Sequence, residues 1–160
     1  MRAQRSLGCF FLLLAAPAAA DEPIPGPVPA EILRVVDADT LAVRAHIWPG
    51  HSVETRVRLA GVDAPEVFRP ACPAEAELGE EASAFVESRL PVGASVFLHE
   101  VRLGSFAGRV IGRVALPDGS DLGALLVTRG LAVPDGAPSP WCPTELASAG
   151  PEPVRGLGPR

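Results

Sequence analysis

Residues 31–59 decide the fold, and they read EILRVVDADTLAVRAHIWPGHSVETRVRL. Three runs in this stretch, at 31–36, 41–47 and 53–59, are apolar or alternate polar with apolar residues, which is typical of β-strands. The segment Trp48-Pro49-Gly50-His51 has the composition of a turn between the second and third runs. The stretch therefore predicts three consecutive strands in a meander at the start of a domain.

The segments that follow predict one long helix, two further strands and one short helix. Residues 74–90 place apolar side chains at helical spacing, with glutamates early and an arginine late, as the helix dipole favours. Residues 95–101 and 109–116 read as strands, and Asp121 can cap a second helix over 122–128. The predicted class is α+β, mainly β, with a five-stranded OB-fold barrel and two or three helices.

The two ends of the chain differ in composition from this domain. Residues 1–20 combine two arginines, an apolar run and Ala-Ala-Ala before Asp21, which is typical of a cleaved signal peptide. The apolar run is too short to favour a transmembrane helix, although an uncleaved anchor is the alternative. We expect an exported protein, periplasmic or secreted, with no stable membrane association after cleavage. The expected order is then a proline-rich lead at 21–29, the domain at 30–143 and a disordered tail at 144–160.

Cleavage would remove Cys9 and leave two cysteines, Cys72 and Cys142. An even number of cysteines in an oxidising compartment favours a disulfide. The bond would close a loop of about 70 residues, which chain entropy values at roughly 4 kcal/mol. Two free thiols or half of a zinc site are the alternatives, and a zinc site would need further histidine or cysteine nearby.

Acidic residues gather at the ends of two predicted strands. Asp37-Ala38-Asp39-Thr40 follows the first strand, and residues 58–66, RLAGVDAPE, span the end of the third. A hard cation such as Ca²⁺ prefers carboxylate and carbonyl oxygens, which Asp39 and Asp63 can supply. A phosphoryl group that gains charge is best held by a metal and by the planar fork of an arginine, here Arg58. These residue types favour a calcium-assisted phosphodiesterase.

Together with Gly108-Arg109, these segments resemble the staphylococcal nuclease (thermonuclease) family. The hallmark segments of that family read approximately D-G-D-T, R-L-x-x-[IV]-D-[TA]-P-E and Y-G-R, and the likeness extends over about 31–133 in the same order. The resemblance implies a calcium-dependent nuclease that hydrolyses DNA or RNA and leaves 3′-phosphate ends.

The resemblance also implies which residues bind the metal. Asp39 and Asp63 match the two calcium carboxylates, and the backbone carbonyl of Ala64 matches a further ligand. Asp37 matches an aspartate that is structural in the family. Ala38 replaces the glycine of D-G-D-T, so a positive φ at this position would strain the turn.

The remaining positions concern the phosphate and the attacking water. Glu66 matches the residue that orients or deprotonates the water, while Arg58 and Arg109 match the two arginines that hold the phosphate and its developing charge. Phe106 stands near the family's tyrosine and is our candidate for substrate binding. Each assignment has a structural alternative: Asp39 could be an ordinary turn aspartate, Glu66 a solvated loop glutamate, and Arg58 a surface arginine.

The charge of the chain is unusual for a nuclease. Removal of residues 1–20 leaves 12 basic and 19 acidic residues and moves the formal charge from −5 to −7, and every basic residue is arginine. Affinity for nucleic acid must therefore come from a local arginine patch and the metal, which predicts salt-sensitive binding. We expect a monomer that acts on single strands. The alternatives are a non-catalytic OB-fold module that binds nucleic acid or another ligand in the cell envelope, and a small calcium-binding structural protein. Glu66 favours the enzyme, because a binding module needs no residue to activate water.

Overall fold

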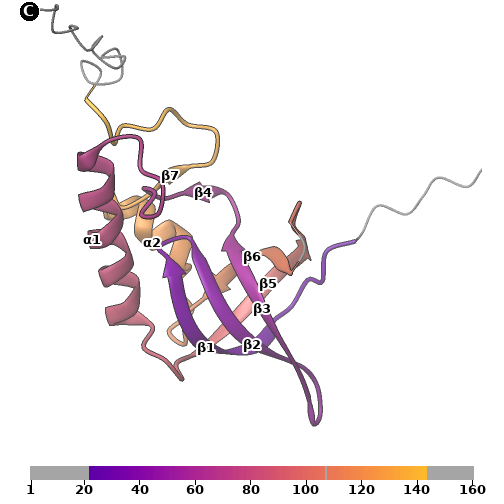
Figure 1. Cartoon of the computed structure of the whole chain (residues 1–160). Coiled ribbons are helices and arrows are strands. Elements are labelled where there is room, and N and C mark those ends of the chain that lie inside the picture. Colours follow the sequence, from indigo (N-terminus) through magenta and orange to yellow (C-terminus); the bar gives the residue numbers. More distant parts are fainter. Residues whose placement is uncertain (1–21, 107, 144–160) are drawn as a thin grey trace, which may run out of the picture.

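The computed structural model describes residues 22–106 and 108–143, so the expected signal peptide at 1–20 and the whole of the expected tail at 144–160 lie outside the described residues. Five strands close into a barrel in the order β1-β2-β3-β6-β5 (Figure 1). Their bounds are β1 Val28–Asp37, β2 Thr40–Trp48, β3 His51–Leu59, β5 Ser95–Leu103 and β6 Arg109–Ala115. All neighbours are antiparallel except β3 and β6, which are parallel. The predicted OB-fold barrel is confirmed.

Strand alternation separates the core of the barrel from the face that carries the charged residues. Val57 and Leu59 on β3 are buried. Arg56 and Arg58, which alternate with them along the strand, lie outside the core. The buried interior is formed by aliphatic side chains from all five strands, including Ile32, Leu41, Val43, Val57, Val96, Leu98 and Val114. This close-packed interior gives the outer face of β3 a rigid base.

Two helices cover the barrel. Helix α1, Pro73–Arg89, stands beside β1, and Ala82 and Val86 on it are buried in the core (Figure 1). Helix α2, Leu122–Thr128, has the predicted bounds, and Asp121 caps it by accepting a hydrogen bond from the amide of Ala124 at 2.9 Å. Neither of these described helices is long and apolar enough to cross a membrane.

Two very short strands, β4 (Val62–Asp63) and β7 (Val133–Pro134), were not predicted from the sequence. They pair antiparallel with each other, and the amide of Asp135 donates to the carbonyl of Gly61 at 3.0 Å. Gly61 has a φ of 75°, which allows the chain to turn sharply between β3 and β4. Runs of two residues carry too little periodicity to be found from sequence, yet this pairing fixes the backbone of Asp63.

The chain before residue 30 is more ordered than a loose lead. Strand β1 begins at Val28, three residues before the predicted start, and pairs with both β2 and β5. Upstream, Ile24 exchanges two backbone hydrogen bonds with Val101, at 2.8 and 2.9 Å. The prolines of this segment have no amide donor, but the residues between them do, and their hydrogen bonds attach the segment to β5.

The predicted disulfide between Cys72 and Cys142 is confirmed, with the two Cα atoms 5.9 Å apart. Cys72 directly precedes α1, and Cys142 follows the loop after β7, where Trp141 is buried. The bond therefore attaches the end of the described chain to the loop that carries Glu66.

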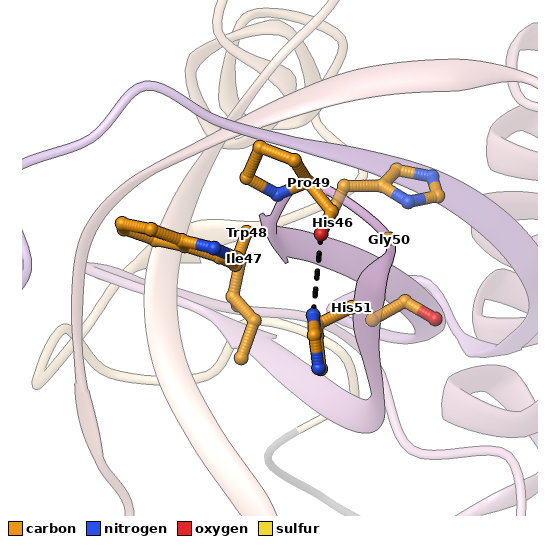
Figure 2. A pocket seen from close by; sticks show the side chains of 7 residues that line it. His46, Ile47, Trp48, Pro49, Gly50 and His51 are labelled. Carbon is orange, nitrogen blue, oxygen red and sulfur yellow. Dashed lines mark hydrogen bonds between the residues drawn. The ribbon is translucent and has the colours of Figure 1, made fainter.

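A separate hollow lies away from the predicted site, at the tip of the β2–β3 hairpin (Figure 2). It has a volume of about 580 Å³ and is lined only by the seven consecutive residues 46–52. Trp48 is 72% exposed there, and Nδ1 of His51 lies 3.2 Å from the carbonyl oxygen of Pro49. Since this hollow is enclosed by one turn and lined by no carboxylate, it does not resemble a phosphodiesterase site.

Candidate active site

Arg58 connects the two carboxylates that the sequence assigned to the metal. Its Nη1 donates to Oδ2 of Asp39 at 2.5 Å, and its Nη2 donates to Oδ1 of Asp63 at 2.7 Å. Burial disfavours the charge of Arg58, but the two carboxylates more than offset this effect and raise the pKa of Arg58. The structure thus brings together Asp39 from the turn between β1 and β2, Arg58 near the end of β3 and Asp63 at the end of β4.

The position of Asp39 follows from the tight turn between β1 and β2. Its carbonyl accepts a hydrogen bond from the amide of Leu59 at 2.8 Å, which attaches the turn to the end of β3. Its Oδ1 accepts from Oγ1 of Thr40 at 2.9 Å and its Oδ2 from the amide of Ala64 at 3.2 Å. Ala38 is fully buried and is not among the described residues with positive φ, so alanine in place of glycine does not strain this turn.

A cavity of about 160 Å³ surrounds this group, and we call it the acidic pocket. It is lined by Asp37, Asp39, Arg58, Asp63, Ala64, Pro65, Glu66 and Glu75. Five carboxylates against one guanidinium give the pocket an excess of negative charge. Oδ1 of Asp37 is buried there without a hydrogen-bond partner, and burial, followed by the charge of Asp39, raises the pKa of Asp37 to about 6.

The donors of the acidic pocket fit a hard cation. Anionic oxygens in excess, one of them buried and unpartnered, are what Ca²⁺ prefers over nitrogen or sulfur ligands. Over residues 22–106 and 108–143, however, no three acidic, histidine or cysteine side chains are already grouped as metal ligands. The guanidinium of Arg58 instead donates to one oxygen each of Asp39 and Asp63.

The loop between β4 and α1 presents Glu66 at the edge of the acidic pocket. The Glu66 side chain is exposed, and its Oε1 accepts a hydrogen bond from the amide of Phe68 at 3.0 Å. Glu75, on the first turn of α1, binds the backbone of this loop. Its two carboxylate oxygens accept hydrogen bonds from the amides of Glu66 at 3.4 Å and Ala71 at 2.5 Å. Glu75 therefore orders the backbone on which Glu66 is mounted.

Helix α1 approaches this loop so closely that one helical position requires glycine. A Cβ added to Gly79 would lie 2.9 Å from the carbonyl oxygen of Pro65 and 3.0 Å from Cγ2 of Val67. Glycine inside a helix is unfavourable by about 1 kcal/mol relative to alanine, so close packing explains its presence here. Gly79 thus sets the position of the residues on either side of Glu66.

A second pocket, of about 470 Å³, adjoins the first, and we call it the arginine groove. Four arginines line it, together with Asp37 and Glu66, which also line the acidic pocket; the full lining is Arg34, Val36, Asp37, Thr40, Arg56, Glu66, Phe68, Arg69 and Arg109. The guanidinium of Arg109 lies 4.7 Å from the ring centroid of Phe106, and its Nε is buried without a partner. The two pockets therefore form one continuous surface with a negative and a positive half.

The structure relates the predicted site residues in a specific way. Asp39, Arg58, Asp63, Ala64 and Glu66 line the acidic pocket, whereas Arg109, with Phe106 against it, belongs to the arginine groove. Glu75, Arg34, Arg56, Arg69 and Phe68 also line this surface and were not predicted as site residues. Nothing in their local sequence separates them from surface residues, because their place depends on strand register and on the path of the loop.

Residues 56–140 match the sequence model of the family described as staphylococcal nuclease homologue, which is more than half of the 160 residues. The chain belongs to the staphylococcal nuclease family. The matched segment of this nuclease homologue includes Arg58, Asp63, Glu66 and Arg109. Asp39 precedes the match, yet it contacts Arg58 and Ala64 within it. No curated protein matches the chain.

Proposed function

We propose that the protein is an exported, calcium-dependent nuclease that hydrolyses phosphodiester bonds of DNA or RNA and leaves 3′-phosphate ends. One observation carries the proposal: the acidic pocket and the arginine groove meet at Asp37 and Glu66. A phosphodiester placed at this junction would have carboxylates on one side and guanidinium groups on the other. Membership in the nuclease family supports the same reading.

The side chains suggest a division of work in the reaction. A bound calcium ion, held by Asp39, Asp63 and the carbonyl of Ala64, would supply Lewis-acid stabilisation of the phosphate charge. Glu66, exposed at the junction, accepts a proton from the water that attacks phosphorus. The bond from phosphorus to the 5′-oxygen breaks, that oxygen takes up a proton, and the phosphate stays on the 3′-oxygen of the other fragment.

The two arginines stabilise the charge that develops on phosphorus. Nε of Arg109 is buried without a partner, so it would gain a hydrogen bond if a small shift of the side chain exposed it to an oxygen of the substrate. The two Nη atoms of Arg58 are occupied by Asp39 and Asp63. Each of these Nη atoms carries a second N–H that can donate to a phosphate, and a cation bound to the same carboxylates would free the rest of the fork.

Other features support export and a single-stranded substrate. The disulfide between Cys72 and Cys142 is suited to an oxidising compartment such as the periplasm or the medium. With a formal charge of −7 after loss of residues 1–20, the protein must rely on the arginine groove for attraction. A flexible single strand can follow such a narrow surface, and a monomer provides the whole of it.

The test is digestion of single-stranded DNA by the purified protein, with calcium and with excess chelator. We expect cleavage with calcium, loss of cleavage in chelator, and fragments that a 3′-phosphatase converts into primers for a polymerase. Binding of the DNA without cleavage under any divalent cation would favour the non-catalytic OB-fold module instead. Cleavage that is undiminished in chelator would contradict the metal assignment.

A further inference from the structure

Three arginines of the groove lie in one row across the barrel. Arg34 on β1 is the register partner of Ala42 on β2, Ala42 is the partner of Arg56 on β3, and Arg56 is the partner of Arg109 on β6. Directly paired residues point to the same face of a sheet, and neighbouring strands lie about 4.8 Å apart. The row therefore runs perpendicular to the strands, from Arg109 beside the catalytic junction to Arg34, with only the small side chain of Ala42 between Arg56 and Arg34.

The four arginines of the groove form no ion pairs with carboxylates in the described part of the chain. Within the described part of the chain, Arg34, Arg56, Arg69 and Arg109 have no carboxylate oxygen within ion-pair distance, whereas Arg44, Arg58 and Arg113 each have at least two such partners. Like charges gathered around one groove repel one another, which disfavours the fold unless a ligand brings negative charge. Two carboxylates, Asp37 and Glu66, also line the groove without forming an ion pair with these arginines in the described residues, and further acidic residues lie on α1.

An exposed aromatic side chain borders the same groove. Phe68 lines it and is 69% exposed, and Arg69 follows directly. This exposure is large for a phenylalanine, because contact between its apolar ring and water is unfavourable. Since Phe68 follows Glu66 by two residues, on the loop that α1 holds in place, its ring is positioned near the proposed catalytic junction.

We propose that Arg34, Arg56, Arg69 and Phe68 form a subsite for the nucleotides next to the scissile phosphate of a single strand. The row of guanidinium groups binds successive phosphates, and Phe68 stacks on an unpaired base. The inference deepens the proposed function, on which it rests, by naming the part of the substrate beyond the cleaved bond. It gives this acidic protein without lysine a local basic surface for a polyanion.

The combination of features selects a single strand over other polyanions. A duplex keeps its bases stacked and paired, so Phe68 could not contact the face of a base. An acidic peptide would meet the arginines but would leave Phe68 without a planar partner. The subsite therefore predicts that both halves, charge and stacking, contribute to affinity for the same ligand.

The first experiment measures binding without catalysis, in excess chelator. Fluorescence anisotropy follows a labelled oligothymidylate of about ten nucleotides, a length within the usual range for one OB-fold. We expect Arg34→Gln with Arg56→Gln to weaken binding about tenfold or more and to reduce the slope of log K against log salt by about 1.4, because each phosphate contact contributes about 0.7 for single strands. Phe68→Ala should weaken binding by about fivefold or more with little change in slope.

Matched controls lie outside the groove. Arg89→Gln is the control for each single arginine substitution and removes one charge near the far end of α1, roughly 20 Å along the helix from Glu75. Trp48→Ala removes a similarly exposed aromatic at the hairpin tip. Both should bind the oligonucleotide like the parent. Equal losses in the control and groove variants, or equal binding of duplex and polyglutamate by the parent, would overturn the subsite.

The second experiment separates the subsite from the proposed chemistry. We expect the ratio of kcat/KM for the oligonucleotide to that for thymidine 5′-(p-nitrophenyl phosphate), which has a single phosphodiester, to fall about tenfold in the Arg34 and Arg56 variants. An unchanged ratio would contradict the subsite even if the nuclease were active. If the parent cleaves neither substrate, the proposed function fails, and the binding experiment still decides on the subsite.

Discussion

Nη1 of Arg58 donates a hydrogen bond to Oδ2 of Asp39 at a distance of 2.5 Å, and this contact pairs the one guanidinium that lines the acidic pocket with a buried carboxylate. Asp39→Asn keeps the shape of the side chain but removes its charge. We expect calcium affinity to fall about tenfold or more, since a carboxylate ligand is lost. Because the Asp39 side chain is only 5% exposed and Arg58 would lose a charged partner, the free energy of unfolding should fall by about 1–2 kcal/mol.

Isothermal titration with calcium and urea unfolding test both parts of this prediction. Asp135→Asn is the matched control, because Asp135 is exposed in the loop after β7. Calcium affinity that is equal in Asp39→Asn and Asp135→Asn would remove Asp39 from the metal site.

Glu66→Gln tests the residue assigned to the attacking water. The amide keeps an oxygen that can accept the hydrogen bond from the Phe68 amide, but it no longer accepts a proton. We expect turnover on single-stranded DNA to fall about a hundredfold or more, with calcium affinity largely intact. Glu77→Gln, an exposed change on α1, should cleave like the parent. A Glu66→Gln enzyme with parental turnover would show that Glu66 does not act on the water.

Gly79→Ala separates stability from positioning of the active-site loop. Alanine raises helix propensity by about 1 kcal/mol, but its Cβ would meet the Pro65 carbonyl at 2.9 Å. The loop must shift, so we expect activity to fall about tenfold or more while the free energy of unfolding changes by about 1 kcal/mol or less. Kinetics and urea unfolding on the same preparation distinguish the two effects. An enzyme with full activity would show that the loop does not depend on this contact.

The disulfide between Cys72 and Cys142 should stabilise the domain mainly by restricting the unfolded chain. Replacing both cysteines with serine is expected to lower the free energy of unfolding by about 2–4 kcal/mol without abolishing the barrel. Mass spectrometry of protein from its native compartment, before and after reduction, checks the bond itself. Two thiols that react freely with an alkylating agent before reduction would show that the bond does not form there.

Much of the fold could be predicted because it depends on local patterns. Alternation identified the five strands of the barrel, and Asp121 with Gly130 marked both ends of α2. Strands β4 and β7 were missed because their two-residue pairing is entirely non-local. The ends of several strands also moved by up to three residues, since cross-strand pairing extends them beyond the periodic core.

The site could be predicted only where it coincides with contiguous motifs. Asp39, Arg58, Asp63 and Glu66 stand in two short segments that the chain brings together at strand ends. The row from Arg34 to Arg109 depends on the register of four strands, which no single segment contains. Glu75 and Gly79 look like ordinary helix residues, and their role follows only from the approach of the loop to α1.

In the proposed reaction, guanidinium groups hold the phosphate in the transition state. Lysine in place of Arg109 keeps the charge but loses the fork and the contact with the Phe106 ring. The same change at Arg58 loses the bridge between Asp39 and Asp63. Arg129→Lys, at the end of α2, is the control for the substitution itself.

The most direct measurement is the single-turnover rate of cleavage of single-stranded DNA by Arg109→Lys, at saturating calcium and enzyme. Under these conditions weaker binding of substrate or metal does not limit the rate, so a change reports on the chemical step. We expect a rate about a hundredfold or more below that of the parent and of Arg129→Lys. A rate equal to that of the parent would contradict the assignment of the arginines to catalysis, even in a protein that cleaves DNA.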